Sequence, residues 1–338
     1  TGGDPLDDRI FIVPVEQVSM VNLRNVIADR LGDDSGASTP IATGDDPPAV
    51  ELAAEIVENP QTVDTRDGRA IGYADVGDPD GDPVFVFHGF PNSRVFGALF
   101  DEAGREHGLR IIAPERPGLG VSDPDPDRTL TDWPADVADV ADALGVGEFA
   151  VFGISGGGPY AAATAALLGE RVERVAIGCG LAPMGAVDLR ERLWYYSARF
   201  VPSGNKLALW LLGRRAIDDR DAFLEAMAES AAPADEELWT GEVGKVVHAS
   251  IVEARRNHGL DPLVTETEVF GSPWGFDLSA IDVPVGLWYG KADVLVPPEM
   301  GLYLTEKIPT AEAHIYPDLD HLSVITENQE DIAAWLAG

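Results

Sequence analysis

The chain has 338 residues, of which 58 are acidic and 24 are Lys or Arg, so its formal net charge is −34 at pH 7. Hydrophobic residues make up 45% of it, which is enough for a folded core and excludes global disorder. Nucleic acid and anionic membranes are excluded as partners, because binding either one requires a basic face. No apolar run approaches the ~20 residues that span a bilayer, so no membrane insertion is expected.

The acidic residues are spread along the whole chain, and only four basic residues are lysines. A surface covered in carboxylates repels itself at low ionic strength, whereas at molar salt the Debye length shrinks to about 3 Å and the repulsion fades. This composition resembles that of proteins from organisms that accumulate salt, and we expect a halophilic source. A cytoplasmic location is expected, with export left open because the chain begins at Thr1.

The single cysteine, Cys179, excludes an intrachain disulfide and a thiolate metal cluster. It ends the apolar run 175–179, where a small buried core residue is expected. Four histidines lack partners at ligand spacing, so no metal site is predicted at them. They are His107, His248, His258 and His314.

Residues 1–60 form an N-terminal extension and linker. The sequence predicts a short strand at 10–13, a helix over 18–31 and a second helix over 48–58, separated by a linker at 32–48 that is rich in Gly, Asp, Ser and Pro. Two interpretations stay open for this extension. It is either an appendage packed on the surface or a docking segment through which the protein forms a homodimer.

A different pattern begins near residue 61. A β-hairpin over 63–73, broken at Asp67 and Gly68, is followed by alternating strands and helices. The predicted strands are 84–87, 109–113, 149–152, 172–179, 283–289 and 313–316. The predicted helices are 93–107 (with Ser93 as N-cap), 132–144, one from Gly157, one over 300–308 and a last one through Trp335. This alternation predicts an α/β fold with a mostly parallel sheet and helices on both faces.

The alternation stops between residues 182 and 278, where the patterns are helical and no convincing strand occurs. A helical insertion between two stretches of one sheet predicts a cap. We therefore divide the chain into the extension 1–60, a core formed by 61–181 and 279–338, and a cap over 182–278.

The central motif follows the predicted strand 149–152 and opens a helix. It reads Gly153-Ile154-Ser155-Gly156-Gly157 and fits the pattern G-x-S-x-G. Glycines around the serine permit the tight strand-to-helix turn that lifts its Oγ into a cleft. The N-terminus of the helix behind that turn favours developing negative charge.

On these residues the sequence resembles the α/β-hydrolase superfamily, in particular its serine esterases and lactonases with a helical cap. The resemblance covers about 61–338, and further motifs match in chain order. They are His88-Gly89-Phe90-Pro91 after one strand, Arg116-Pro117-Gly118-Leu119-Gly120-Val121-Ser122-Asp123 after the next, the acid loop from Tyr289 to Pro297, and the segment Pro317-Asp318-Leu319-Asp320-His321.

The resemblance implies a role for each motif. Ser155 is the expected nucleophile, His321 the base and Asp293 the acid that orients the imidazole, in the chain order of this superfamily. The backbone N–H groups of Phe90 and Gly156 are the expected oxyanion hole. Supporting positions in the same motifs are His88, Gly89, Gly153 and Gly157.

A serine at this turn also limits the reaction. Epoxide hydrolases and haloalkane dehalogenases of the superfamily carry aspartate there, so their chemistry is not expected. The expected function is cofactor-free hydrolysis of a small, fairly apolar ester or lactone, with Trp194, Tyr195 and Trp239 as candidate pocket residues. Three alternatives share every motif: a C–C bond hydrolase, a perhydrolase, and a ligand receptor on a retained hydrolase fold.

Overall fold

The computed structural model describes residues 41–42, 46–184 and 219–338. The predicted strand 10–13, the predicted helix 18–31 and the aromatic residues Trp194 and Tyr195 lie outside the described residues. The described residues belong to one compact unit. In the part of the chain that is described, no helix combines the length and the apolar character needed to cross a bilayer.

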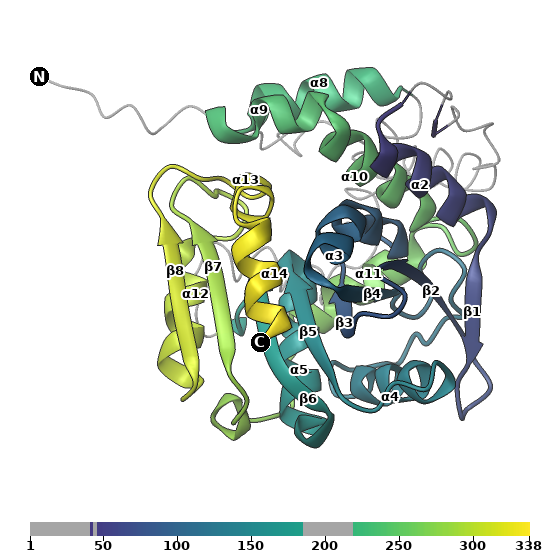
Figure 1. Cartoon of the computed structure of the whole chain (residues 1–338), viewed down its shortest axis with the longest axis vertical. Helices are drawn as coiled ribbons and strands as arrows, with labels where there is room; N and C mark the ends of the chain where they lie inside the picture. The colour runs from purple at the N-terminus through teal and green to yellow at the C-terminus, as the bar shows by residue number, and fades with distance from the viewer. Residues whose placement is uncertain (1–40, 43–45, 185–218) are drawn as a thin grey trace, which may run out of the picture. The chain divides into compact units, whose positions relative to one another are not determined.

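An eight-stranded sheet with the order β1-β2-β4-β3-β5-β6-β7-β8 organises this unit (Figure 1). Its strands are β1 Gln61–Asp64, β2 Ala70–Gly77, β3 Asp82–Phe87, β4 Leu109–Pro114, β5 Phe149–Ile154, β6 Val172–Gly178, β7 Val285–Gly290 and β8 Ala311–Tyr316. The first two strands are antiparallel, as the predicted hairpin requires, and the other six run parallel to one another. The predicted fold class is confirmed.

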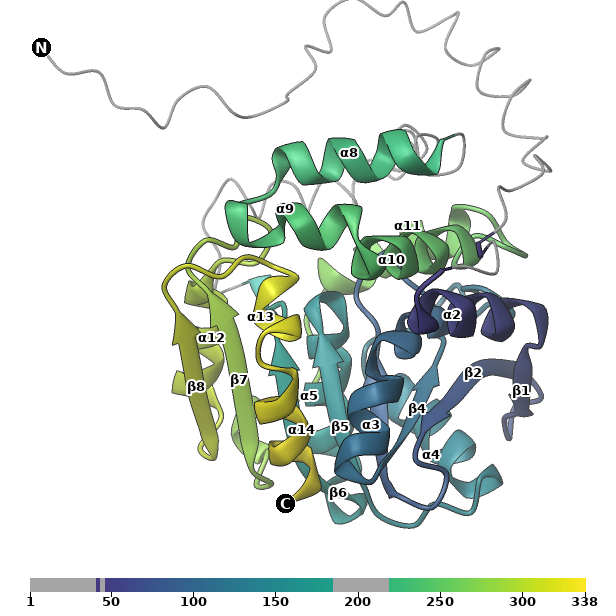
Figure 2. The ribbon, with the colours of Figure 1, turned by 45° about the horizontal axis from the view of Figure 1, so that its top comes forward.

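Helices cover both faces of the sheet. Those outside the insertion are α2 Pro48–Glu58, α3 Asp101–His107, α4 Trp133–Ala143, α5 Gly158–Leu167, α12 Pro298–Lys307, α13 Ser323–Thr326 and α14 Gln329–Ala337. Helices α3 and α14 pack together on one face, and α4, α5 and α12 lie on the other (Figures 1 and 2). The 3-10 helix η2 Arg94–Phe100 precedes α3, and the Ser93 side chain accepts a hydrogen bond from Val95 N at its start.

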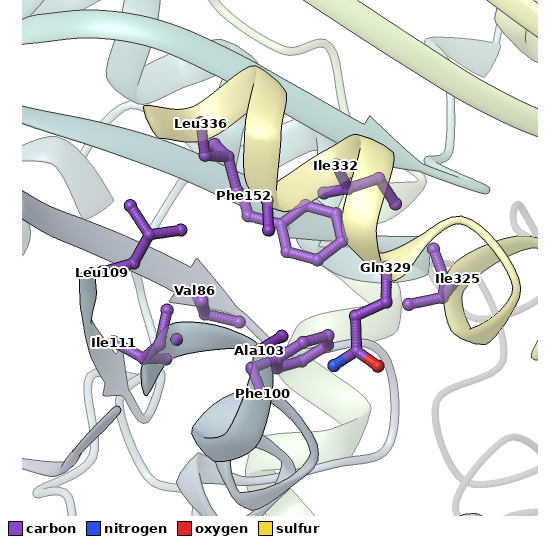
Figure 3. A pocket seen from close by; sticks show the side chains of 12 residues that line it. Val86, Phe100, Ala103, Leu109, Ile111, Phe152, Ile325, Gln329, Ile332 and Leu336 are labelled. Carbon is purple, nitrogen blue, oxygen red and sulfur yellow. The ribbon is translucent and has the colours of Figure 1, made fainter. Parts of the chain in front are cut away.

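The core lies along the central strands. All six residues of β5 and all six of β7 are buried, as expected for parallel strands covered on both faces. This core contains a gap of about 20 Å³ between α14 and strands β3 to β5. Figure 3 shows the side chains that line it. Its lining includes Val86, Phe100, Phe152 and Ile332 and contains no titratable side chain, so this gap belongs to core packing.

Four described α-helices lie between β6 and β7 and are called the insertion helices below. They are α8 Arg220–Ser230, α9 Pro233–Thr240, α10 Glu242–Glu253 and α11 Asp261–Phe270. Figure 2 shows α8, α9 and α10 above the carboxyl ends of the parallel strands. Helix α2 packs against α10 and η2, so residues 48–58 belong to the same compact unit as the sheet.

Candidate active site

The turn after β5 holds Ser155 in a conformation that L-residues rarely adopt, with φ of +53°. Two glycines allow the chain to turn there. A Cβ at Gly157 would collide with the carbonyl oxygen of Phe87, and one at Gly153 would lie 2.6 Å from Cβ of Ala161. Helix α5 begins at Gly158, directly after the turn. The local sequence therefore fixes a strained serine between a strand end and a helix N-terminus.

His321 and Asp293 come from loops after neighbouring strands, β8 and β7. Their side chains are joined by a hydrogen bond of 2.7 Å between Nδ1 and Oδ2. The other Asp293 oxygen accepts the backbone N–H groups of Leu295 and Val296, each at 2.8 Å. Because Asp293 is held by its own loop, it fixes the imidazole so that Nδ1 carries a proton and Nε2 is left for proton transfer.

Two opposing effects act on the pKa of His321. Burial disfavours the charged imidazolium, but the negative charge of Asp293 and its hydrogen bond favour it, as do the charges of Asp235 and Asp320. The net result is a pKa raised above the ordinary value of 6.5. A base whose pKa is raised in this way accepts a proton more readily near neutral pH.

Phe90 and Gly156, the two residues whose N–H groups are expected to form the oxyanion hole, lie in contact. A Cβ built on Gly156 would be 3.3 Å from the nitrogen of Phe90 and 3.1 Å from its Cβ. A Cβ on Gly89 would be 3.2 Å from Cβ of Ser155. The loop after β3 and the turn after β5 are thus in contact at the two positions that the sequence predicts as the oxyanion hole.

A buried arginine, Arg116, holds the loop that carries Phe90. Arg116 donates hydrogen bonds to the carbonyl oxygens of His88 at 2.6 Å and Gly89 at 3.0 Å. The His88 ring bonds through Nδ1 to the Gly89 carbonyl at 2.8 Å. Burial, assisted by the charge of Arg116, holds the pKa of His88 well below its ordinary value. His88 is therefore neutral and organises the loop.

Arg116 is itself paired with Glu266 of α11, at 2.6 Å, and both side chains are fully buried. Arg128 and the hydroxyl of Tyr160 donate to the other oxygen of Glu266, each at 2.7 Å. The sequence motif singled out Arg116 but not Glu266. One carboxylate among 58 acidic residues carries no signal of its own, and only the fold brings it to the arginine.

A cavity of about 480 Å³ opens beside these groups. Ser155, Gly156, Phe90, Gly89, His321 and Trp239 line it together with apolar side chains from the sheet loops and the insertion helices. Those apolar side chains include Phe96, Leu99, Leu181, Phe223, Met227, Val243, Val247, Ile251, Phe270, Val294, Leu295 and Met300. Asp293 lies behind His321. The predicted pocket residues Trp194 and Tyr195 fall outside the described residues.

Among the described residues, one cluster of three side chains could offer ligands to a metal ion: a thiol, a carboxylate and an imidazole. Potential ligand atoms of Cys179, Asp293 and His321 lie within 4.8 Å of one another. However, Nδ1 of His321 is bonded to Asp293, and burial raises the pKa of the Cys179 thiol well above its ordinary value. The Cys179 side chain is completely buried, consistent with a small core residue.

Comparisons with known proteins agree with the fold of this chain. Residues 82–328 match the family model described as the alpha/beta hydrolase fold. A 2-hydroxymuconate semialdehyde hydrolase from Pseudomonas putida is 26% identical over 260 residues, which are 73% of this chain and 83% of that protein. Among solved structures, a bromoperoxidase from Bacillus anthracis aligns with a TM-score of 0.63 and 21% identity, over 83% of this chain and all of that one. An esterase from Exiguobacterium antarcticum aligns with a TM-score of 0.57 and 20% identity, over 81% of this chain and 96% of that one.

Proposed function

The chain belongs to the alpha/beta hydrolase fold family, and we propose that it is a serine hydrolase of small, uncharged esters or lactones. The observation that carries the proposal is the hydrogen-bonded pair of Asp293 and His321, which serves the same cavity as the strained Ser155. A serine hydroxyl needs an adjacent base to act as a nucleophile, and this pair supplies one.

In the first half of the reaction, Oγ of Ser155 attacks the acyl carbon while its proton passes to Nε2 of His321. The carbonyl oxygen becomes negatively charged, and the N–H groups of Phe90 and Gly156 stabilise it. Asp293 stabilises the imidazolium that forms. When the tetrahedral intermediate collapses, His321 returns the proton to the leaving alcohol, and an acyl-serine remains.

In the second half, water replaces the alcohol. His321 removes a proton from the water, the hydroxide attacks the acyl carbon, and the proton then passes to Oγ of Ser155. The carboxylic acid leaves and the free serine is restored. His321 carries the proton in both halves of the reaction, first from Ser155 and then from water. The proposed reaction therefore requires no cofactor.

The cavity favours an uncharged, largely apolar acyl group. Among its described lining residues, none is Lys, Arg, Asp or Glu, and the polar side chains are Asn92, Ser155, Thr267, His321 and Thr326. An anionic substrate would find no cationic partner among these residues. A volume of about 480 Å³ also lies in the range of pockets that hold small organic molecules.

A second candidate is cleavage of an activated C–C bond by the same residues. The similarity to the 2-hydroxymuconate semialdehyde hydrolase, which covers 83% of that protein, favours it. The uncharged lining of the cavity favours an ester substrate instead.

We propose a small-molecule substrate and a cytoplasmic location. We also propose a halophilic source, since the net charge of −34 suits a salt-rich environment.

The first experiment is hydrolysis of p-nitrophenyl butyrate in molar KCl by the wild-type protein and by Ser155→Ala. The proposal expects turnover by the wild type and its loss in the variant. A folded wild type that leaves this ester and a panel of short-chain esters and lactones untouched contradicts it. In a separate assay, turnover of 2-hydroxymuconate semialdehyde would identify C–C hydrolysis.

A further inference from the structure

The His321 side chain pairs with Asp293, and the loop that carries His321 is also held by a helix of the insertion. Asp235, in the first turn of α9, is buried and accepts two backbone N–H groups from that loop. Its Oδ2 accepts from Leu322 at 2.6 Å, and its Oδ1 accepts from Ser323 at 2.8 Å. Asp235 therefore supplies the hydrogen-bond acceptors for the first N–H groups of α13, directly after His321.

The histidine loop makes the reciprocal contact. Asp320 accepts the backbone N–H of Ala232, the residue before α9, through Oδ2 at 2.8 Å. Its Oδ1 accepts the N–H of His321 at the same distance. Asp235 and Asp320 each accept N–H groups at the start of a helix in the other segment. We call these contacts the α9–histidine-loop link.

The link also places charge around the imidazole. Carboxylates reach His321 from three elements: Asp293 after β7, Asp320 after β8 and Asp235 on α9. The Cys179 thiol, at the end of β6, contacts the His321 carbonyl oxygen at 3.5 Å. Its raised pKa keeps it uncharged near neutral pH. Asp235 is the carboxylate of this group that comes from the insertion.

We propose that Asp235 is a positioning residue for the proposed hydrolase, acting on the base through the α9–histidine-loop link. The inference rests on the proposed function for its kinetic consequence, because a misplaced His321 slows proton transfer. The link itself is a property of the fold. When α9 leaves the loop, the base loses both a backbone restraint and a neighbouring negative charge. Proton transfer at Ser155 therefore depends on the contact between α9 and the loop that carries His321.

The decisive variant is Asp235→Asn, which keeps the shape of the side chain and removes its charge and one acceptor. We expect kcat for p-nitrophenyl butyrate to fall about tenfold with KM little changed, because orientation is lost. We expect the acid limb of kcat/KM to move to lower pH by about one unit. The matched control is Glu236→Gln, which removes a charge from the exposed neighbour on α9 and should leave the limb in place.

NMR titration of the histidine ring protons measures the same effect without a substrate. The His321 signal is identified by its absence in His321→Gln. A lower titration midpoint in Asp235→Asn supports the link, and an unchanged midpoint in a folded variant overturns it. If wild-type protein hydrolyses no ester, the proposed function fails while this titration still decides the inference.

A second variant keeps the inference testable if Asp235→Asn does not fold. Ala232 has φ of −68° and ψ of 159°, which proline adopts without strain. Ala232→Pro removes the N–H that Asp320 accepts and leaves every carboxylate in place. Slower turnover with an unchanged melting temperature supports the link. Wild-type kcat in this variant overturns it.

Discussion

At the scale of single residues, the site combines one strained position with several restrained ones. Ser155 has a left-handed backbone that the surrounding glycines permit, whereas Asp293 is fixed through both of its oxygens. Strain at a serine is retained when the neighbouring structure holds it in place. The restrained carboxylate then gives the imidazole a single orientation, which is the condition for proton transfer to Oγ.

Replacing Ser155 by alanine tests the nucleophile. We expect Ser155→Ala to lose at least ~1,000-fold in kcat and to keep the wild-type melting temperature within about 2 °C, because the Oγ faces a cavity and adds little packing. Ester hydrolysis and thermal unfolding measured on one preparation check this. Retention of most of the activity would remove Ser155 from its proposed role.

The raised pKa of His321 makes a prediction about pH. The base must be neutral to accept a proton, so kcat/KM should fall as pH drops through the pKa of the free enzyme. Burial lowers that pKa, but the three carboxylates Asp293, Asp235 and Asp320 raise it by more than burial lowers it. The acid limb should therefore lie above the ordinary histidine value of 6.5. A pH profile of ester hydrolysis measures it. A limb in the carboxylate range, near pH 4, would contradict this assignment.

At the scale of elements, buried carboxylates join the insertion helices to η2 and to the loop after β4. Glu266 on α11 pairs with Arg116, and Glu253 on α10 pairs with Arg94 of η2 at 2.9 Å. These pairs are almost completely buried, so removing one partner leaves an uncompensated charge. Through Arg116, the α11 contact also reaches the loop that carries Phe90.

Glu266→Gln tests this connection. It leaves two buried guanidinium groups without their counter-charge, and we expect a loss of about 3 kcal/mol in the free energy of unfolding, measured in urea. Burial raises the pKa of Glu266, but Arg116 and Arg128 outweigh it and lower the pKa below the ordinary value. The stabilising charge is therefore present above pH ~4.5 and lost at lower pH. Glu268→Gln, half-buried on the same helix, is the control and should cost under about 1 kcal/mol.

The sequence predicts those parts of the structure that nearby residues determine. Gly108 ends α3 in the left-handed conformation, and Ser93 caps η2, because each acts within one turn of its own sequence. The chain order of Ser155, Asp293 and His321 likewise predicts that strand ends bring them to one edge of the sheet. Asp235 and Glu266 could not be predicted, because their partners lie 87 and 150 residues away.

At the scale of the whole molecule, charge dominates. A net charge of −34 on 338 residues produces self-repulsion that salt screens, with a Debye length of about 30 Å at 0.01 M and about 3 Å at 1 M. Arginines that are paired inside, such as Arg94 and Arg116, do nothing to neutralise the surface. The folded state gathers these carboxylates more closely than the unfolded chain does, and its stability should depend on ionic strength.

Thermal unfolding between 0.01 M and 1 M KCl tests this dependence. We expect the melting temperature to rise with KCl, most steeply at the low end, where screening changes most. The same ionic strength from NaCl should give a similar rise up to about 0.3 M, because screening does not depend on the cation. A melting temperature indifferent to both salts would end the halophilic interpretation.

The place of the insertion in the sheet has a consequence for how this protein can diversify. The chain leaves the sheet at the end of β6 and re-enters it at β7, and these strands are hydrogen-bonded neighbours, Val175 opposite Val285 and Gly178 opposite Trp288. Because β6 and β7 are adjacent in the strand order, the insertion separates no other pair of strands, and exchanging it leaves the other strand registers intact. Recombination between relatives can thus replace, as a single module, the part of the cavity wall that the insertion helices supply. A donor module would have to carry a carboxylate at the place of Asp235 to remain compatible with the histidine loop.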